Sequence, residues 1–169
     1  GGGLSCHGAR AVCTLSGVSI VDNKATNDDT TGTNERSEGG GLSCAGLALC
    51  VLDTVLIKNN KAQHGAGLSV TNSTMTMTGL HIRSNEATTG RGGGIYAKHS
   101  TVLLNNTVIK NCSSHRGGGI YVSNSNMTML GGQLQGNEAV PYSDGSDTFD
   151  SVGGGLSCHG ARAVCTLSG

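Results

Sequence analysis

Short stretches of alternating apolar and polar residues follow glycine clusters throughout the chain. An aliphatic residue comes first, in the row Leu4, Leu42, Leu68, Ile95, Ile120 and Leu156, and a small or apolar residue follows two positions later, in the row Cys6, Cys44, Val70, Ala97, Val122 and Cys158. A period of two places alternate side chains on opposite faces of a strand. Each cluster therefore predicts a short strand with one buried face. Tyr96 and Tyr121 lie between the buried positions and are expected to point outward.

Six glycine clusters divide the chain into segments. They begin at residues 1, 39, 65, 92, 117 and 153, which gives spacings of 38, 26, 27, 25 and 36 residues. The shorter spacings are typical of one coil of a parallel β-helix, and the longer ones predict the same coil with an inserted loop of about a dozen residues. We therefore expect a coil to begin near each of these six positions.

A row of asparagines lies further along each complete coil. Each Asn follows an aliphatic residue by three positions, counted from Ile20, Ile57, Ile82, Val108 and Leu134, which gives the row Asn23, Asn60, Asn85, Asn111 and Asn137. Asn tolerates a left-handed backbone, and stacked amides can hydrogen-bond across the roughly 4.8 Å between neighbouring strands. The row therefore predicts an Asn ladder at one corner of the stacked coils.

Together these rows predict an all-β fold. We expect residues 1–169 to form a single right-handed parallel β-helix solenoid, with three short strands per coil and about five and a half coils. A leucine-rich repeat is the competing solenoid, but it requires a helical or 3₁₀ segment in each repeat. The chain has no amphipathic helical stretch, which favours the β-helix.

The composition suits strands and turns. Aromatic residues make up 2% of the chain, Trp is absent and 29 residues are Gly. The 11 Lys and Arg balance the 11 Asp and Glu, and no basic cluster interleaves with aromatics, which argues against nucleic-acid binding. No apolar run approaches the roughly 18 residues of a membrane-spanning segment.

Two segments carry a resemblance to known proteins. GGGIYAKHSTVLLNNTVIKN at 92–111 and GGGIYVSNSNMTMLGGQLQGN at 117–137 resemble the right-handed β-helix repeats of polymorphic outer-membrane-protein-like and pectin-lyase-like adhesins. Those families pair a glycine-rich tetrad with a later aromatic-or-aliphatic-x-x-Asn, and here the second element is always aliphatic. The resemblance implies secretion, surface display, and adhesion or scaffolding, although unrelated functions share this fold.

Residues 1–17 recur without a change as residues 153–169. The internal coils share only their skeleton with one another, so structural constraint does not account for this identity. We expect 1–152 to be one repeat unit, 153–169 to be the start of the next identical unit, and the partners to be copies of the chain in tandem or end to end. Duplicated end caps are the alternative, although the caps of solenoids are polar, atypical coils.

The cysteines occur mainly in pairs that flank a short turn. We expect the disulfides Cys6–Cys13, Cys44–Cys50 and Cys158–Cys165, because each pair can meet across one corner of a coil. Buried free thiols are the alternative reading. The spacings do not fit a metal site, and no cofactor is expected. Cys112 has no partner in this scheme. Because it is the neighbour of Asn111 in the expected ladder, we interpret it as a small buried residue, with a reactive thiol as the second reading.

Sequons and acidic loops are the remaining surface features. Asn72, Asn105 and Asn126 are the glycosylation candidates, whereas the sequon at Asn111 is expected to be buried in the ladder. The two inserted loops hold the possible contact residues Asp28, Asp29, Glu35, Tyr142, Asp144, Asp147, Phe149 and Asp150. Such loops at one edge suit lateral contacts or ligand binding.

No pair of carboxylates stacks on adjacent strands, as a polysaccharide lyase or hydrolase would require, so we do not expect an enzyme. The sequence favours a structural unit of an extracellular or cell-surface filament or stalk. A surface adhesin or carbohydrate-binding stalk is the second reading, with glycans or surface proteins as partners, and an enzyme is the third.

Overall fold

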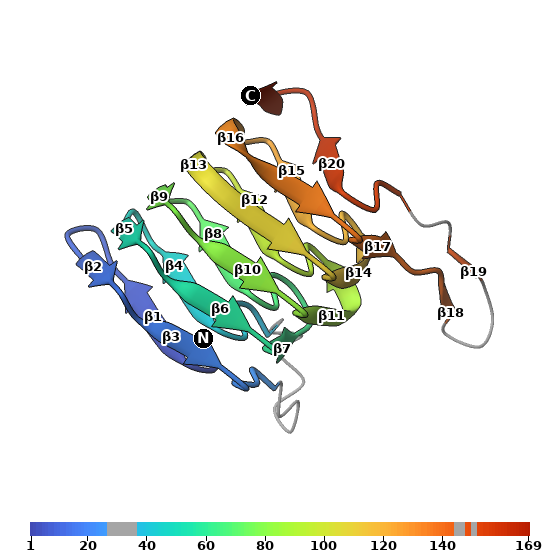
Figure 1. The fold of residues 1–169 in the computed structure, drawn as a ribbon, viewed down its shortest axis with the longest axis horizontal. Helices are drawn as coiled ribbons and strands as arrows, with labels where there is room; N and C mark the ends of the chain where they lie inside the picture. Colours follow the sequence, from blue (N-terminus) through green and yellow to red (C-terminus); the bar gives the residue numbers. More distant parts are fainter. Residues whose placement is uncertain (27–36, 144–147, 150–151) are drawn as a thin grey trace.

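The protein is all-β and its main sheets are parallel (Figure 1). The computed structural model describes residues 1–26, 37–143, 148–149 and 152–169. Within these ranges no α-helix forms, and so none is long and apolar enough to cross a membrane. We use the word coil for the segment that begins at each glycine cluster.

The first sheet, sheet A, takes one strand from each coil. Its order is β1 (Leu4–His7), β4 (Leu42–Ala45), β8 (Leu68–Thr71), β12 (Ile95–Lys98), β15 (Ile120–Ser123) and β20 (Leu156–His159). The strands pair in register, so that Leu42 lies beside Leu68 and Ile95 lies beside Ile120. This pairing brings the predicted aliphatic residues into one row.

The second sheet, sheet B, contains the strands that follow the first corner. They are β2 (Val12–Ser16), β3 (Ser19–Val21), β5 (Leu49–Asp53), β6 (Leu56–Lys58), β9 (Thr74–Thr78), β10 (His81–Arg83), β13 (Thr101–Lys110), β16 (Asn126–Gln135) and β21 (Val164–Ser168). The ten-residue strands β13 and β16 each run through two of the expected strand positions. In these two coils one long strand thus replaces two short ones.

A third sheet, sheet C, takes one strand from each of four coils. It consists of β17 (Glu138–Ala139), β14 (Ser113–Arg116), β11 (Glu86–Arg91) and β7 (Lys61–Ala62), all parallel. The strands β18 (Tyr142–Ser143) and β19 (Thr148–Phe149) form a separate antiparallel pair. Successive chain segments are thus laid side by side in all three parallel sheets, an arrangement compatible with a β-helix-like solenoid (Figure 1).

The core is a column of aliphatic and sulfur-containing side chains that the parallel sheets enclose. Leu42, Leu68, Ile95 and Ile120 of sheet A are completely buried. The facing rows from sheet B are Cys50, Met75, Val102 and Met127, and Leu52, Met77, Leu104 and Met129. These rows are narrow, which explains how a chain with so few aromatic residues can fill its interior.

Glycine is required where each coil begins. Gly92 has a φ of 65°, and a Cβ atom there would collide with the carbonyl oxygen of Ile95. Gly117 has the same left-handed conformation and the same restriction. Side chains other than hydrogen are strained in this region, so the recurrent glycines follow directly from the tight start of sheet A.

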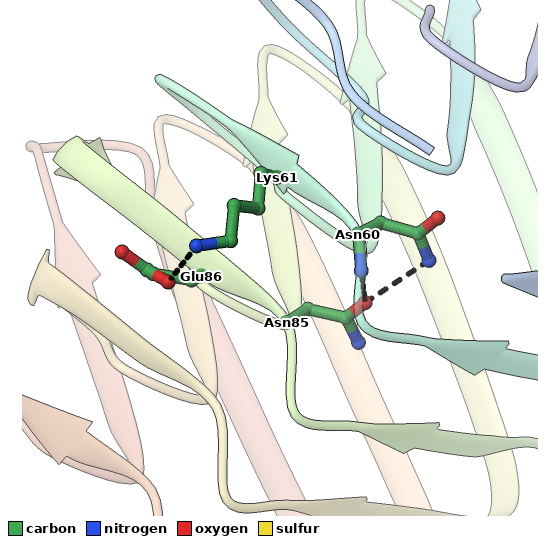
Figure 2. A network of polar contacts seen from close by, with 4 residues as sticks. All are labelled: Asn60, Lys61, Asn85 and Glu86. Atoms are coloured by element: carbon green, nitrogen blue, oxygen red, sulfur yellow. Dashed lines mark hydrogen bonds and ion pairs between the residues drawn. The ribbon is translucent and has the colours of Figure 1, made fainter. Parts of the chain in front are cut away.

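The Asn ladder links the coils at the corner before sheet C. The amide of Asn60 donates to Asn85 Oδ1 at 3.1 Å, and the backbone N–H of Asn60 donates to the same oxygen at 2.9 Å (Figure 2). Asn23 makes the equivalent two bonds to Asn60. Asn60 and Asn85 are completely buried. The ladder provides their amides with hydrogen-bond partners, which solvent cannot supply inside the protein.

The prediction that Asn111 belongs to this ladder is wrong. Asn111 is exposed, with a φ of 53°, and the next residue, Cys112, takes the ladder position. The backbone N–H of Cys112 donates to Asn137 Oδ1 at 3.1 Å, as an Asn in this place would. The reason is packing: Ile109, not Val108, lies in register with the buried Ile82, which shifts the whole row of this coil by one residue.

Candidate functional site: a groove between disulfide-bonded turns

The structure contains the three disulfides that the spacing predicts, all at the corner between sheets A and B. They join Cys6 to Cys13, Cys44 to Cys50 and Cys158 to Cys165, at sequence separations of 7, 6 and 7. Each bond connects a strand of sheet A to the next strand of sheet B across one turn. The disulfides therefore mark the coils in which this turn is longest.

The three coils between these turns have a shorter corner. Val70 lies in register with Cys44 and Met75 lies in register with Cys50, yet Val70 and Met75 are only five positions apart. The same spacing separates Ala97 from Val102 and Val122 from Met127. Longer turns therefore stand on either side of three short ones.

A ladder of serine hydroxyls fixes the short turns. The hydroxyl oxygen of Ser100 accepts a hydrogen bond from the backbone N–H of Ser73 at 3.2 Å, and that of Ser125 accepts from the N–H of Ser100 at 3.0 Å. The residue before each serine, Asn72, His99 or Asn124, has a φ between 46° and 50°. This backbone turns the chain sharply and holds three polar side chains in one row along the stack.

Long and short turns together form a groove of about 570 Å³. Leu47 of the Cys44–Cys50 turn and Arg162 of the Cys158–Cys165 turn line its two ends. The rest of the lining comes from Ala48, Asn72, Ser73, Thr74, His99, Ser100, Thr101, Asn124, Ser125 and Asn126. None of the described residues that line the groove is a carboxylate, and the polar groups they offer are amides, hydroxyls, an imidazole and one guanidinium group.

The sequons occupy different positions relative to this groove. Asn72 and Asn126 are exposed and line it, whereas Asn105 is half-buried on β13. The expectation that Asn111 is buried is wrong, since its side chain is exposed at the corner beside Cys112. Glycosylation at Asn72, Asn105 and Asn126 stays a prediction.

The predicted contact loops are only partly covered by the structure. Asp28, Asp29, Glu35, Asp144, Asp147 and Asp150 lie outside the described residues. The backbones of Tyr142 and Phe149 pair with each other in the antiparallel ladder β18–β19. A role of these loops in contacts therefore stays a prediction from the sequence.

The outward tyrosines of sheet A are covered. Tyr96 and Tyr121 stack on each other with ring centroids 5.8 Å apart, but they are only 2% and 1% exposed. Side chains from the ends of the preceding coils lie over them, among them Arg91, whose guanidinium carbon is 5.1 Å from the Tyr121 ring centroid. An exposed aromatic platform for sugars is therefore not present at this pair.

Cys112 is the one free cysteine, and it is buried. Burial raises the pKa of its thiol, and the weak hydrogen bonds from Asn85 act in the opposite direction. The thiolate, which is the reactive and metal-binding form, is thereby disfavoured. In the part of the chain that the structure describes, no cluster of three or more His, Cys, Asp or Glu is arranged to hold a metal ion.

Comparisons with known proteins return no relative for this chain: no family model, no curated protein and no solved structure matches it.

Proposed function

We propose that this chain is a structural unit of a right-handed parallel β-helix with three strand positions per coil, and that such units stack in tandem to form a long extracellular filament or stalk. The proposed repeat is 152 residues, from residue 1 to residue 152. Its role is mechanical: a stiff rod that holds other surfaces at a distance. The chain is proposed to have no catalytic activity of its own.

One observation carries this proposal. The duplicated segment 1–17 and 153–169 pairs on opposite edges in its two copies, with Leu4 beside Leu42 of the following coil and Leu156 beside Ile120 of the preceding coil. Cys13 likewise lies beside Cys50, and Cys165 lies beside Met127. A segment that accepts a parallel neighbour on either edge is suited to the interior of a continuous stack.

The disulfides support an extracellular location. Disulfides persist in oxidising compartments and are rare in the cytosol, and three are present in this chain. The sequons at Asn72 and Asn126 lie on exposed residues and suit the same route. Six corners join sheets A and B, and each of three contains one disulfide. Reduction would remove these three cross-links.

Tandem arrays of one, two and three 152-residue units test the filament. Each unit adds five coils, so we expect electron microscopy and small-angle scattering to record a rod that lengthens by about 24 Å per unit, at roughly 4.8 Å per coil. A two-unit array with a twenty-residue Gly/Ser linker at the junction is the matched control, and it should give two separate short particles. Equal behaviour of the linked and direct arrays would refute continuous stacking.

A carbohydrate-binding adhesin is the second candidate, and the groove favours it. Its row of Asn72, His99 and Asn124 presents donors and acceptors that suit the hydroxyls of a sugar chain running parallel to the stack. Binding to a glycan array that is lost in the double variant His99→Ala/Asn124→Ala would support this function. The variant His81→Ala is the control, because His81 is exposed on sheet B away from the groove lining.

A further inference from the structure

A stack of four rings runs along the outer face of sheet A, and all of them except His159 are buried. His64, Tyr96, Tyr121 and His159 follow one another along the stack, with neighbouring ring centroids 5.1, 5.8 and 6.4 Å apart. The core lies on the opposite face, where Ile120 and Val122 are buried. Tyr121 is nevertheless 1% exposed, so residues outside the core must cover it.

The cover is a row of side chains, each one position before a coil-opening glycine. Glu38 pairs with His64, Arg91 pairs with Arg116, and Arg116 pairs with Val152 along the stack. Glu38 reaches across the next strand of sheet A, where its Oε2 accepts hydrogen bonds from Ser69 and Thr71 at 3.0 Å each. Arg91 makes the corresponding approach to β15, where its guanidinium group lies over the ring of Tyr121.

The charges of this row are not balanced at its arginine end. Arg91 and Arg116 lie in direct register on β11 and β14, and like charges on neighbouring strands repel. Among the described residues the ion pair Lys61–Glu86 involves neither of them. Among the described residues, therefore, neither arginine forms an ion pair with a carboxylate.

Two buried polar atoms, one on Tyr121 and one on Arg116, lack hydrogen-bond partners among the described residues. The Tyr121 hydroxyl and the Nε atom of Arg116 are shielded from solvent and make no hydrogen bond to a described residue. Buried polar groups are nearly always hydrogen-bonded, because loss of hydration without compensation costs free energy. The Arg91 guanidinium lies over the Tyr121 ring, and Arg116 follows Arg91 in register on the next strand. Arginine offers only hydrogen-bond donors, and the phenol hydroxyl can also donate.

We propose that Arg91, Arg116 and Tyr121 bind a tetrahedral oxyanion, the sulfate or phosphate group of a free ion or of a larger ligand. The planar fork of Arg matches two oxygens of such a group, and the phenol donates to a third. The negative charge relieves the repulsion between Arg91 and Arg116. This site is independent of the filament, because it uses residues within three consecutive coils.

The chain 1–169 in an oxyanion-free chloride buffer is the material for the test. We expect thermal unfolding to shift upward with sodium sulfate or phosphate in a saturable manner, beyond the shift in sodium chloride of equal ionic strength. The saturable part is decisive because sulfate stabilises folded proteins in general, without saturation. Arg91→Gln and Arg116→Gln should each reduce the apparent affinity at least tenfold, whereas Lys58→Gln, a basic residue on sheet B, should leave it unchanged.

Tyr121→Phe separates a binding role from a structural one. Without oxyanion, this variant should unfold at the same temperature as the unsubstituted protein or higher, since it removes an unpaired buried hydroxyl. With saturating sulfate it should unfold at a lower temperature than the unsubstituted protein. A variant that is less stable in both buffers, or a sulfate response as large as that of the unsubstituted chain, would overturn the proposal.

The source of the oxyanion is distinguished by competition. A sulfated disaccharide and inorganic sulfate are compared on the same chain by calorimetry. Tighter binding of the disaccharide by tenfold or more, abolished in Arg116→Gln, supports a sulfated ligand, and equal affinity supports the free ion. Absence of binding by either probe and by phosphate would refute the site.

Discussion

The side-chain amide of Asn85 donates to the sulfur of Cys112 at a distance of 3.8 Å, in the place where the other coils have an amide-to-amide hydrogen bond. The corresponding bond from Asn60 to Asn85 is 3.1 Å long and ends on an oxygen. Sulfur is a weak hydrogen-bond acceptor, so this step is the weakest in the ladder. Cys112 is completely buried and its backbone still bonds to Asn137, so the ladder is weakened here without being broken.

Cys112→Asn should therefore stabilise the protein. The introduced amide oxygen accepts from Asn85, and the amide nitrogen can reach the Ile82 carbonyl as that of Asn85 reaches the carbonyl of Ile57. One added hydrogen bond of this kind contributes about 1 kcal/mol to the free energy of unfolding. Urea denaturation, with the midpoint as the measured quantity, checks this value.

Asn111→Gly is the control for that substitution. Asn111 has a left-handed backbone and Gly136 takes the equivalent place in the next coil, so glycine fits there without strain. We expect the free energy of unfolding to change by no more than about 0.5 kcal/mol. A large loss in Asn111→Gly, together with no gain in Cys112→Asn, would mean that the ladder passes through Asn111.

Asn60→Ala should be far more costly than Lys61→Ala, although the two residues are adjacent (Figure 2). Asn60 is buried and its side chain bonds to Asn23, to the Ile20 carbonyl and to Asn85. Its removal leaves several buried groups unpaired, and we expect a loss of about 3 kcal/mol. Calorimetric unfolding of the two variants measures the difference.

Lys61→Ala removes only the ion pair with Glu86, whose Oε2 lies 2.7 Å from the Lys61 ammonium (Figure 2). The two side chains are 53% and 45% exposed, so solvent screens the interaction and its contribution is about 0.5 kcal/mol. Similar losses in Asn60→Ala and Lys61→Ala would contradict a structural role for the ladder.

The register of one coil shows what the sequence pattern can and cannot supply. In the segment 102–109 aliphatic residues occur in adjacent positions, as Val102, Leu103 and Leu104, and as Val108 and Ile109. Period-two alternation fits either choice, and packing selects Val102, Leu104 and Ile109 for the core. Direct alignment of Ile57-Lys58-Asn59-Asn60 with Ile109-Lys110-Asn111-Cys112 would have given the right register.

The groove could be predicted from the sequence, whereas the cover over the tyrosines could not. The spacing from Cys44 to Cys50 is longer than that from Val70 to Met75, so the uneven turns that form the groove were present in the sequence. The cover over Tyr121 was not, because it depends on how far the Arg91 side chain reaches from the end of the coil that begins at residue 65. Alternation describes one strand at a time and contains no information on contacts between coils.

Replacement of the disulfide Cys44–Cys50 by the pair found one coil further on should preserve the fold. Cys44 lies beside Val70 and Cys50 beside Met75, so Cys44→Val/Cys50→Met introduces side chains that the same core already accommodates. We expect a loss of about 2 kcal/mol, the entropy that a cross-link over a loop of this size removes from the unfolded chain. The far-ultraviolet circular dichroism spectrum should stay the same.

Cys44→Ala/Cys50→Ala is the informative comparison for that variant. It removes the same cross-link but leaves a cavity in the core beside Val70 and Met75, so its loss should exceed that of the Val/Met pair. If the two double variants are equally stable, the sulfur atoms contribute nothing to packing and the column model of the core is wrong.

Alkaline pH should destabilise the protein through Cys112. Burial raises the pKa of this thiol above its ordinary value of 9.0. At a pH between the ordinary and the raised value the unfolded chain has released the proton while the folded protein retains it. The free energy of unfolding therefore falls as pH rises through that range, and the contribution is constant below it. Cys112→Asn has no such group, so its stability advantage over the unsubstituted protein should widen above about pH 9. Urea midpoints of both proteins between pH 7 and pH 10 measure this difference, and an advantage independent of pH would show that Cys112 is not shielded from solvent.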